Sequence, residues 1–242
     1  MRRTPNRREI LADAFAALTA SFAARLAAQA PTQPASPSPA TSCVLTPVTS
    51  EGPYYFDPKL VRADITENQP GVPLSLSLRV VSVDTCKPVS RARVDLWHAD
   101  AKGIYSGYED QFGNGAAARS AKGRTYLRGT QITNNDGVVT FRTLYPSWYR
   151  GRTPHIHFKV FLEPREVAVS QLYFPDKISD QVYSTSSAYA PRKPGRDTYN
   201  DDDMYLRGGR TGGAFCDVVA DGNGANPGYN ASVVIGIARG TA

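Results

Sequence analysis

Residues 72–83 read VPLSLSLRVVSV, a run in which apolar and polar side chains alternate. Successive side chains of a β-strand point to opposite faces of a sheet, so the alternation predicts a strand with one face in a core. Residues 155–162, HIHFKVFL, are the second strong strand candidate. These two segments indicate a protein built from β-sheets.

Further strand candidates recur along the chain, with turn signals between them. They are residues 91–98, 125–133, 138–144, 171–174 and 231–238. Residues 134–137 (NNDG) supply a hairpin turn, and no segment after residue 30 shows sustained helical periodicity. The pattern predicts an all-β fold, an antiparallel β-sandwich. Its long loops, at residues 101–124 and 175–228, are the expected location of an active site.

The first 30 residues have the features of an export signal. Basic residues precede an Ala/Leu/Phe stretch at residues 10–28, and Ala28-Gln29-Ala30 offers small residues for cleavage. The pair Arg7-Arg8 ahead of this stretch resembles a twin-arginine signal. The stretch is only mildly apolar and carries charges, so it is no stable membrane span. We expect an exported, periplasmic or extracellular protein, with a retained amphipathic helix as the alternative.

Residues 31–42 (PTQPASPSPATS) form a Pro/Ser/Ala linker that is too poor in large apolar groups to pack. The folded domain is therefore expected to cover residues 43–242. The net charge is +6, and half of it lies in residues 1–30. The remaining charge is too weak and too scattered to indicate nucleic-acid binding, and no membrane contact is expected of the mature form.

The chain has three cysteines, Cys43, Cys86 and Cys216. In an oxidising compartment two of them could pair and leave one free. We favour Cys43 with Cys86, although the sequence leaves the connectivity open. There is no CxxC motif, which argues against a cysteine zinc site.

Two of the three histidines form His155-Ile156-His157 inside a predicted strand. Residues two apart in a strand share a face, so both imidazoles project together and make half of a metal site. Tyr149 and Arg152 lie just upstream, whereas residues 145–157 contain no Asp or Glu. Phenolate oxygens favour a ferric ion, and a bound metal can hold tyrosine deprotonated near neutral pH.

Four segments together resemble the intradiol ring-cleavage dioxygenases, the family of catechol 1,2-dioxygenases and protocatechuate 3,4-dioxygenases. The segments are residues 51–55 (EGPYY), 94–106 (VDLWHADAKGIYS), 145–149 (YPSWY) and 152–158 (RTPHIHF). They follow the family's order and approximate spacing and cover roughly residues 43–175. Each motif alone is modest, but the joint match is specific. The family fold is a β-sandwich, in agreement with the strand pattern.

The resemblance implies one Fe(III) per chain. Its implied ligands are two tyrosinates and two histidines: Tyr105, Tyr149, His155 and His157. Tyr149 would also accept a proton from the substrate, and Arg152 and Gln171 would stabilise charge that develops during the reaction. Tyr54 is expected to border the pocket and contact the substrate.

The ligand assignments have alternatives. Tyr108 could take the place of Tyr105, and Tyr145 could take the place of Tyr149, although Tyr145-Pro146 is typical of a turn entry. His98 follows a tryptophan, and the resemblance implies that this position does not bind iron. We expect it to be structural.

The charged and polar assignments have alternatives too. Arg152 could be a solvated surface charge, and Gln171 could be an ordinary residue of an edge strand. The acidic run Asp201-Asp202-Asp203 has no counterpart in the family pattern. It could bind a cation, but we expect a solvated loop.

The implied reaction opens a catechol-type ring between the two hydroxyl-bearing carbons and inserts both atoms of O2, which gives a cis,cis-muconate-type product. Two other classes stay open: a non-enzymatic secreted β-sandwich binding module, and a zinc hydrolase. The combined Tyr/Tyr/His/His/Arg set argues against the first, and the missing carboxylate argues against the second. The sequence leaves the particular catechol and the oligomeric state open, with a homodimer as one option.

Overall fold

The computed structural model describes residues 43–109, 111, 121–190, 195–207, 212–222 and 228–238. The predicted leader (residues 1–30) and linker (residues 31–42) lie outside these residues. Within the described part, no helix is long and apolar enough to cross a lipid bilayer.

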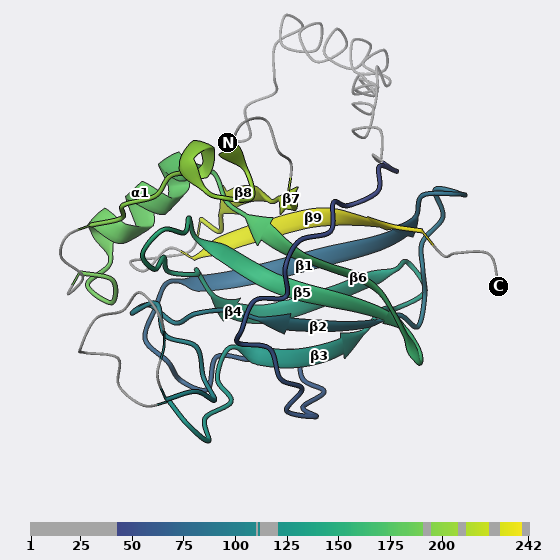
Figure 1. Ribbon diagram of the computed structural model, residues 1–242, viewed down its shortest axis with the longest axis horizontal. Helices are drawn as coiled ribbons and strands as arrows, with labels where there is room; N and C mark the ends of the chain where they lie inside the picture. The colour runs from purple at the N-terminus through teal and green to yellow at the C-terminus, as the bar shows by residue number, and fades with distance from the viewer. Residues whose placement is uncertain are drawn as a thin grey trace, which may run out of the picture. The chain divides into compact units, whose positions relative to one another are not determined.

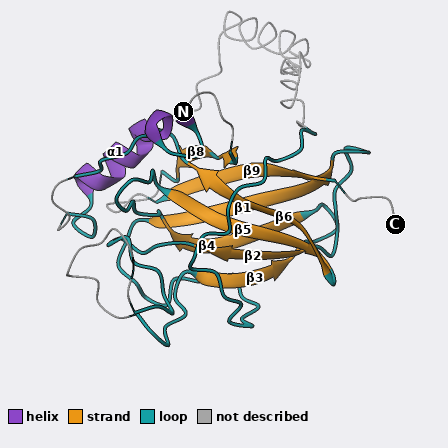
Figure 2. Cartoon of the chain, in the orientation of Figure 1, coloured by secondary structure: helices purple, strands orange, loops and turns teal. Residues whose placement is uncertain are grey.

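Two β-sheets form the frame of the described domain (Figures 1 and 2). The four-stranded sheet, in the order β4-β1-β9-β8, consists of β1 (Pro73–Ser82), β4 (Val138–Leu144), β8 (Asp217–Ala220) and β9 (Tyr229–Ile237). The five-stranded sheet, in the order β3-β2-β5-β6-β7, consists of β2 (Arg93–Trp97), β3 (Arg128–Ile132), β5 (His155–Leu162), β6 (Arg165–Tyr173) and β7 (Ala214–Phe215). The predicted β-sandwich is confirmed.

Strand pairing is antiparallel at most positions, as predicted, but β1 pairs with β9 and β6 pairs with β7 in parallel. The predicted turn between β3 and β4 is confirmed, since the backbone N–H of Gly137 donates to the carbonyl of Asn134 at 3.0 Å. Gly137 has a φ of +73°, a left-handed conformation that glycine adopts without a Cβ clash.

The core lies between the inward faces of the two sheets. Leu76 and Phe141 of the four-stranded sheet belong to the same buried cluster as Ile156 and Phe158 of β5. Burying an aliphatic or aromatic side chain of this kind stabilises the fold by about 1.5–3 kcal/mol. Because β5 alternates, its other side chains, beginning with His155, face the outer side of the five-stranded sheet.

The N-terminal part of the domain crosses that outer side (purple in Figure 1). The backbone N–H of Thr49 donates to the carbonyl of Val169 in β6 at 3.1 Å. Lys159 of β5 forms ion pairs with Glu51 of this segment and, at 2.8 Å, with Glu166 of β6. The segment therefore buries side chains that a solvent-facing sheet would leave exposed.

A disulfide between Cys43 and Cys86 joins the start of this segment to the loop that follows β1, which confirms the favoured pairing. The third cysteine, Cys216, is buried as a free thiol, and burial raises its pKa. A buried, protonated thiol is chemically inert, so Cys216 acts as a small apolar core residue.

The long region at residues 175–228 contains regular structure that the sequence pattern did not predict. It includes α1 (Asp176–Thr185) and the short 3-10 turn η2 (Asn200–Asp202), besides β7 and β8. Helix α1 is only 10 residues long, and the side chains that it packs on the core include Ile178, Val182 and Tyr183. This apolar face is too short to give a sustained helical periodicity. The strands β7 and β8 are short, and their pairing with β6 and β9 defines them.

Candidate metal centre

The two histidines of β5 project together from the outer face of the five-stranded sheet. Their ring centroids lie 4.8 Å apart, and both side chains are almost fully buried. Ile156, between them, points into the core between the sheets. The shared face that the sequence predicted for His155 and His157 is confirmed.

His155 is held by a hydrogen bond in which its Nδ1 donates to the carbonyl of Thr153 at 2.7 Å. This bond sets the tautomer and leaves the lone pair on Nε2 for another partner. The Tyr149 hydroxyl lies 3.0 Å from Nε2 and the Tyr105 hydroxyl lies 3.4 Å from it. Burial, and then the charge of Arg152, lower the pKa of His155, which keeps the ring neutral.

His157 is held by packing against its ring. The indole of Trp97 stacks on it with a centroid distance of 4.9 Å and an interplanar angle of 11°. Gly52 approaches closely, since a Cβ built on it would lie 3.3 Å from Cε1 of His157. The Nδ1 of His157 is buried and has no hydrogen-bond partner among the described residues.

The two tyrosines beside the histidines are buried phenols. Burial raises the pKa of Tyr149, and the guanidinium of Arg152 opposes that rise. Burial also raises the pKa of Tyr105, and the neighbouring Tyr149 adds to the effect. Both phenols therefore stay protonated unless a cation replaces the proton.

The alternative tyrosines are engaged elsewhere. The hydroxyl of Tyr108 donates to the carbonyl of Tyr55 at 2.8 Å. The hydroxyl of Tyr145 lies 2.8 Å from Oγ of Ser179 in α1. The geometry thus favours Tyr105 and Tyr149, whose hydroxyls approach Nε2 of His155, as the phenol donors.

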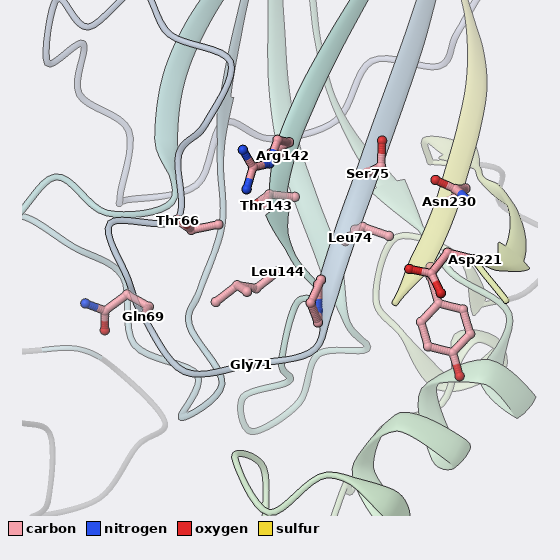
Figure 3. A pocket seen from close by; sticks show the side chains of 12 residues that line it. Thr66, Gln69, Gly71, Leu74, Ser75, Arg142, Thr143, Leu144, Asp221 and Asn230 are labelled. Atoms are coloured by element: carbon pink, nitrogen blue, oxygen red, sulfur yellow. The ribbon is translucent and has the colours of Figure 1, made fainter. Parts of the chain in front are cut away.

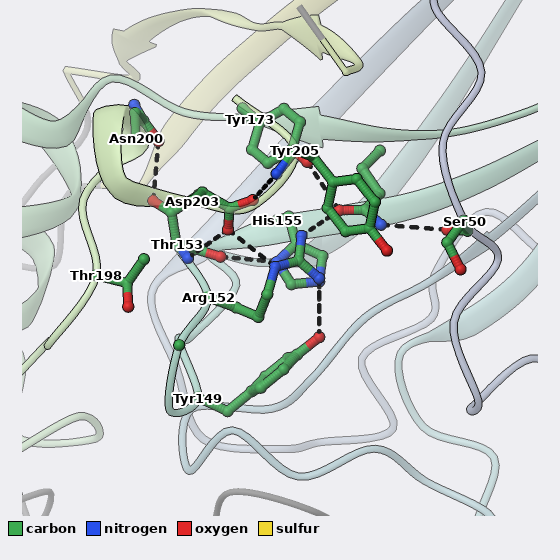
Figure 4. Close-up of polar contacts among 12 residues, drawn as sticks. Ser50, Tyr149, Arg152, Thr153, His155, Tyr173, Thr198, Asn200, Asp203 and Tyr205 are labelled. Atoms are coloured by element: carbon green, nitrogen blue, oxygen red, sulfur yellow. Dashed lines mark hydrogen bonds and ion pairs between the residues drawn. The ribbon is translucent and has the colours of Figure 1, made fainter. Parts of the chain in front are cut away.

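Arg152 lies at the centre of a polar network (Figure 4). One terminal nitrogen, Nη1, is 3.4 Å from the Tyr149 hydroxyl and 3.4 Å from Nε2 of His155. The other, Nη2, donates to Oε1 of Gln171, which also accepts a hydrogen bond from Tyr173 at 2.9 Å. Gln171 is paired with His157 across β5 and β6, so the sheet register brings it to the site.

The remaining predicted site residues lie as follows. Tyr54 stacks on Tyr105 with a centroid distance of 4.8 Å, which places it beside a candidate ligand. His98 donates from Nδ1 to the carbonyl of Ala99 at 2.9 Å and accepts at Nε2 from Thr143 at 2.7 Å. Both ring nitrogens of His98 are thus occupied, in agreement with a structural role.

Comparison with known proteins agrees with this geometry. A family model described as a dioxygenase matches residues 50–193. A solved intradiol ring-cleavage dioxygenase from Tetranychus urticae is similar to the chain with a TM-score of 0.70 and 30% identity, over 81% of this chain and 95% of that one. This chain belongs to the intradiol ring-cleavage dioxygenase family.

Two catechol 1,2-dioxygenases are similar to parts of this chain. Catechol 1,2-dioxygenase 1 of Acinetobacter lwoffii is 36% identical over 109 residues, which make up 43% of this chain and 32% of that enzyme. The match therefore spans about a third of that relative's length. The structure of catechol 1,2-dioxygenase from Pseudomonas arvilla C-1 shares the fold, with a TM-score of 0.51 and 22% identity over 81% of this chain and 63% of that one.

The donor set of this site fits a ferric ion. It combines two imidazoles, held neutral by burial, with two phenols, and phenolate oxygen suits a hard trivalent cation. No group of three or more His, Cys, Asp or Glu that could hold a metal occurs in the described part of the chain. The described residues thus offer none of the carboxylate or cysteine clusters that a zinc hydrolase commonly uses.

The sequence did not predict the roles of three residues that hold the site. Trp97 and Gly52 lie in segments that carry the family resemblance, but their contacts with the ring of His157 were not predicted. The acidic run is exposed at Asp201 and Asp202, as expected of a solvated loop, but this prediction is wrong for Asp203, which is 0% exposed. Its partner is Arg152, far away in the sequence, so no local signal could have revealed the burial.

A separate cavity of about 360 Å³ opens beside β1, β4 and β9 (Figure 3). Its lining includes Ser75, Arg142, Asp221 and Asn230. None of the predicted ligands contributes to it, and the strands beside it belong to the four-stranded sheet. The cavity is thus distinct from the candidate metal centre.

Proposed function

We propose that this chain is a non-haem Fe(III) intradiol dioxygenase that opens a catechol-type ring between its two hydroxyl-bearing carbons. Both atoms of O2 would enter the product, a cis,cis-muconate-type diacid. The observation that carries the proposal is the approach of two phenols, at 3.0 and 3.4 Å, to one imidazole nitrogen beside a second imidazole. Membership of the family supports it.

Four residues would hold the iron: Tyr105, Tyr149, His155 and His157. When bound, one ferric ion per chain would supply a Lewis acid that chelates the two catechol oxygens and activates the ring toward O2. The protein contributes orientation, because Thr153 fixes the ring of His155 while Trp97 and Gly52 fix the ring of His157.

In this proposal Tyr149 receives a proton from the substrate. A catechol must lose two protons to bind through both oxygens, and a phenolate at Tyr149 would be a base beside the binding position. The Nη1 of Arg152 lies 3.4 Å from its oxygen, so the guanidinium stabilises the phenolate before the proton arrives.

Arg152 and Gln171 would stabilise the charge that develops on the ring. Arg152 is 8% exposed, and in a water-poor site a fixed cation acts more strongly than in solvent. Oε1 of Gln171 holds Arg152, while its Nε2 donates to the carbonyl of Ser50 at 3.2 Å. The amide has a second N–H, to which the proposal assigns a substrate oxygen as acceptor.

We also propose that the protein acts outside the cytoplasm. The twin arginines and the apolar stretch in residues 1–30 support export, and a Cys43–Cys86 disulfide suits an oxidising compartment. Fractionation of cells that express the full chain tests this. Dioxygenase protein found only in the cytoplasm, with both cysteines reduced, would exclude export.

The first experiment is a visible absorption spectrum of the purified protein with its iron content measured. Ferric tyrosinate gives a charge-transfer band, and anaerobic catechol is expected to shift that band. Aerobic catechol should then give a muconate-type diacid that retains both atoms of labelled O2. A protein that stays colourless after iron reconstitution, or that forms no ring-opened product from any catechol, would exclude the proposal.

Matched tyrosine variants test the ligand set. Tyr105→Phe and Tyr149→Phe each remove one hydroxyl from the site and are expected to shift or weaken the charge-transfer band. Tyr108→Phe and Tyr145→Phe remove hydroxyls that are bonded elsewhere and should leave the band in place. The opposite pattern would show that the alternative tyrosines are the ligands.

A further inference from the structure

The carboxylate of Asp203 holds both the side chain of Arg152 and the backbone beside it. Its Oδ2 accepts hydrogen bonds from Nε of Arg152 and from the backbone N–H of Thr153, both at 2.9 Å. Its Oδ1 accepts from the backbone N–H of Tyr205 at 3.0 Å. The side chain is 0% exposed, so the carboxylate is buried and its hydrogen-bond partners are groups of the protein.

The guanidinium of Arg152 makes contacts on two sides (Figure 4). Its Nε points to Asp203, whereas Nη1 and Nη2 point to Tyr149, His155 and Gln171. A guanidinium is a planar, rigid fork, so fixing one edge also fixes where the other nitrogens point. The ring centroid of Tyr205 lies 4.7 Å from Cζ of Arg152, and this packing limits tilting of the guanidinium plane.

The segment that carries Asp203 is itself attached to the sheet. Asn200 accepts a hydrogen bond from Oγ1 of Thr153 at 2.8 Å and donates to the carbonyl of Phe174 at 2.9 Å. These bonds connect the segment to the residue two positions before β5 and to the residue directly after β6. The position of Asp203 is thus set by contacts that do not involve Arg152.

Asp203 lies outside the part of the chain that the family model matches, which ends at residue 193. We propose that Asp203 is a positioning residue for this dioxygenase, one that orients Arg152 so that its terminal nitrogens face the reacting ring. The inference rests on the proposed function. Asp203 does not touch the substrate, and its effect on turnover passes through Arg152.

The test compares Asp203→Asn with Asp202→Asn, which changes the exposed neighbouring acid. An amide is neutral and binds a guanidinium more weakly than a carboxylate does. For Asp203→Asn we expect kcat to fall by about 10- to 100-fold, with a KM within about threefold of wild type and unchanged iron content. Asp202→Asn should match wild type in all three.

A second readout needs no iron. In nuclear magnetic resonance of the metal-free full chain, the Nε–H of Arg152, identified by its loss in Arg152→Lys, should exchange slowly with solvent. Asp203→Asn should speed that exchange, and Asp202→Asn should not. If the iron-loaded wild type opens no catechol, the proposed function fails, but this measurement still tests the contact between Asp203 and Arg152.

Asp203→Glu keeps the buried negative charge but changes the length of the side chain. It replaces Asp203→Asn in the same measurements if the asparagine variant does not fold. In every folded variant of Asp203 we expect kcat and the protection of the Arg152 Nε–H to fall together. Wild-type kcat despite fast exchange would overturn the inference, because Arg152 would then work without being held. A reduced kcat with a fully protected Nε–H would overturn it too, because the effect would not pass through Arg152.

Discussion

The substitution Arg152→Ala tests two roles of this buried cation, one in turnover and one in the stability of the fold. The substitution removes the guanidinium beside Tyr149 and Gln171, and it also leaves the carboxylate of Asp203 without its charge partner. We expect the variant to keep its iron, because Arg152 is not among the predicted ligands, and to lose most of its turnover.

The two magnitudes follow from the burial of the pair. Loss of one preorganised donor to developing charge lowers kcat by about 100- to 1,000-fold. Asp203 is 0% exposed and Arg152 is 10% exposed at its side chain, so removal of Arg152 is expected to destabilise the fold by about 3–5 kcal/mol. The bonds from Thr153 and Tyr205 to the carboxylate remain and offset part of that loss.

The double variant Arg152→Ala/Asp203→Asn separates the two effects. Removal of the unpaired carboxylate charge of Asp203 should restore much of the free energy of unfolding, whereas kcat should stay as low as in Arg152→Ala. Denaturant unfolding, iron content and turnover of catechol measure the three quantities. Wild-type kcat in an iron-replete Arg152→Ala protein would refute the catalytic role, and equal stabilities of the single and double variants would refute the buried-charge argument.

Three further predictions concern the histidines and the glycine at the site. His157→Ala removes one of the four predicted ligands and should lose iron, measured by metal analysis of the purified protein. A fully metallated, active variant would contradict the ligand set. Gly52→Ala should destabilise the fold by about 1 kcal/mol or more, since residue 52 has a φ of +73° and a Cβ would press on His157. The variant should also retain iron less tightly. Chemical denaturation measures the first effect and iron titration the second. His98 has a pKa lowered by burial from 6.5 to about 4, so the unfolded chain binds a proton below pH 6.5 that the folded chain does not. Stability is therefore fully present above about pH 6.5 and declines as the pH falls toward about 4, by about 2 kcal/mol at pH 5. His98→Gln should lack this part of the pH dependence in unfolding experiments at matched iron content, and an identical pH slope in the two proteins would show that His98 does not titrate as described.

Local sequence determined the features that depend on neighbouring residues. The alternation in residues 72–83 and the run at residues 155–162 predict β1 and β5 almost to their ends, because side-chain direction in a strand alternates strictly. The same alternation places His155 and His157 on one face. The family motifs added Tyr105 to the predicted ligands. The structure brings its hydroxyl to His155, although the two residues are far apart in sequence.

The tertiary structure alone decided what lies around those residues. Parallel pairing of β1 with β9, the short β7 and β8, and helix α1 all depend on contacts with segments distant along the chain, which no local periodicity encodes. Asp203 shows the physical reason most clearly. An acid within a run of acids has the composition of a solvated loop, and only the fold brings it to Arg152, where burial of the charge is offset by an ion pair and two backbone hydrogen bonds.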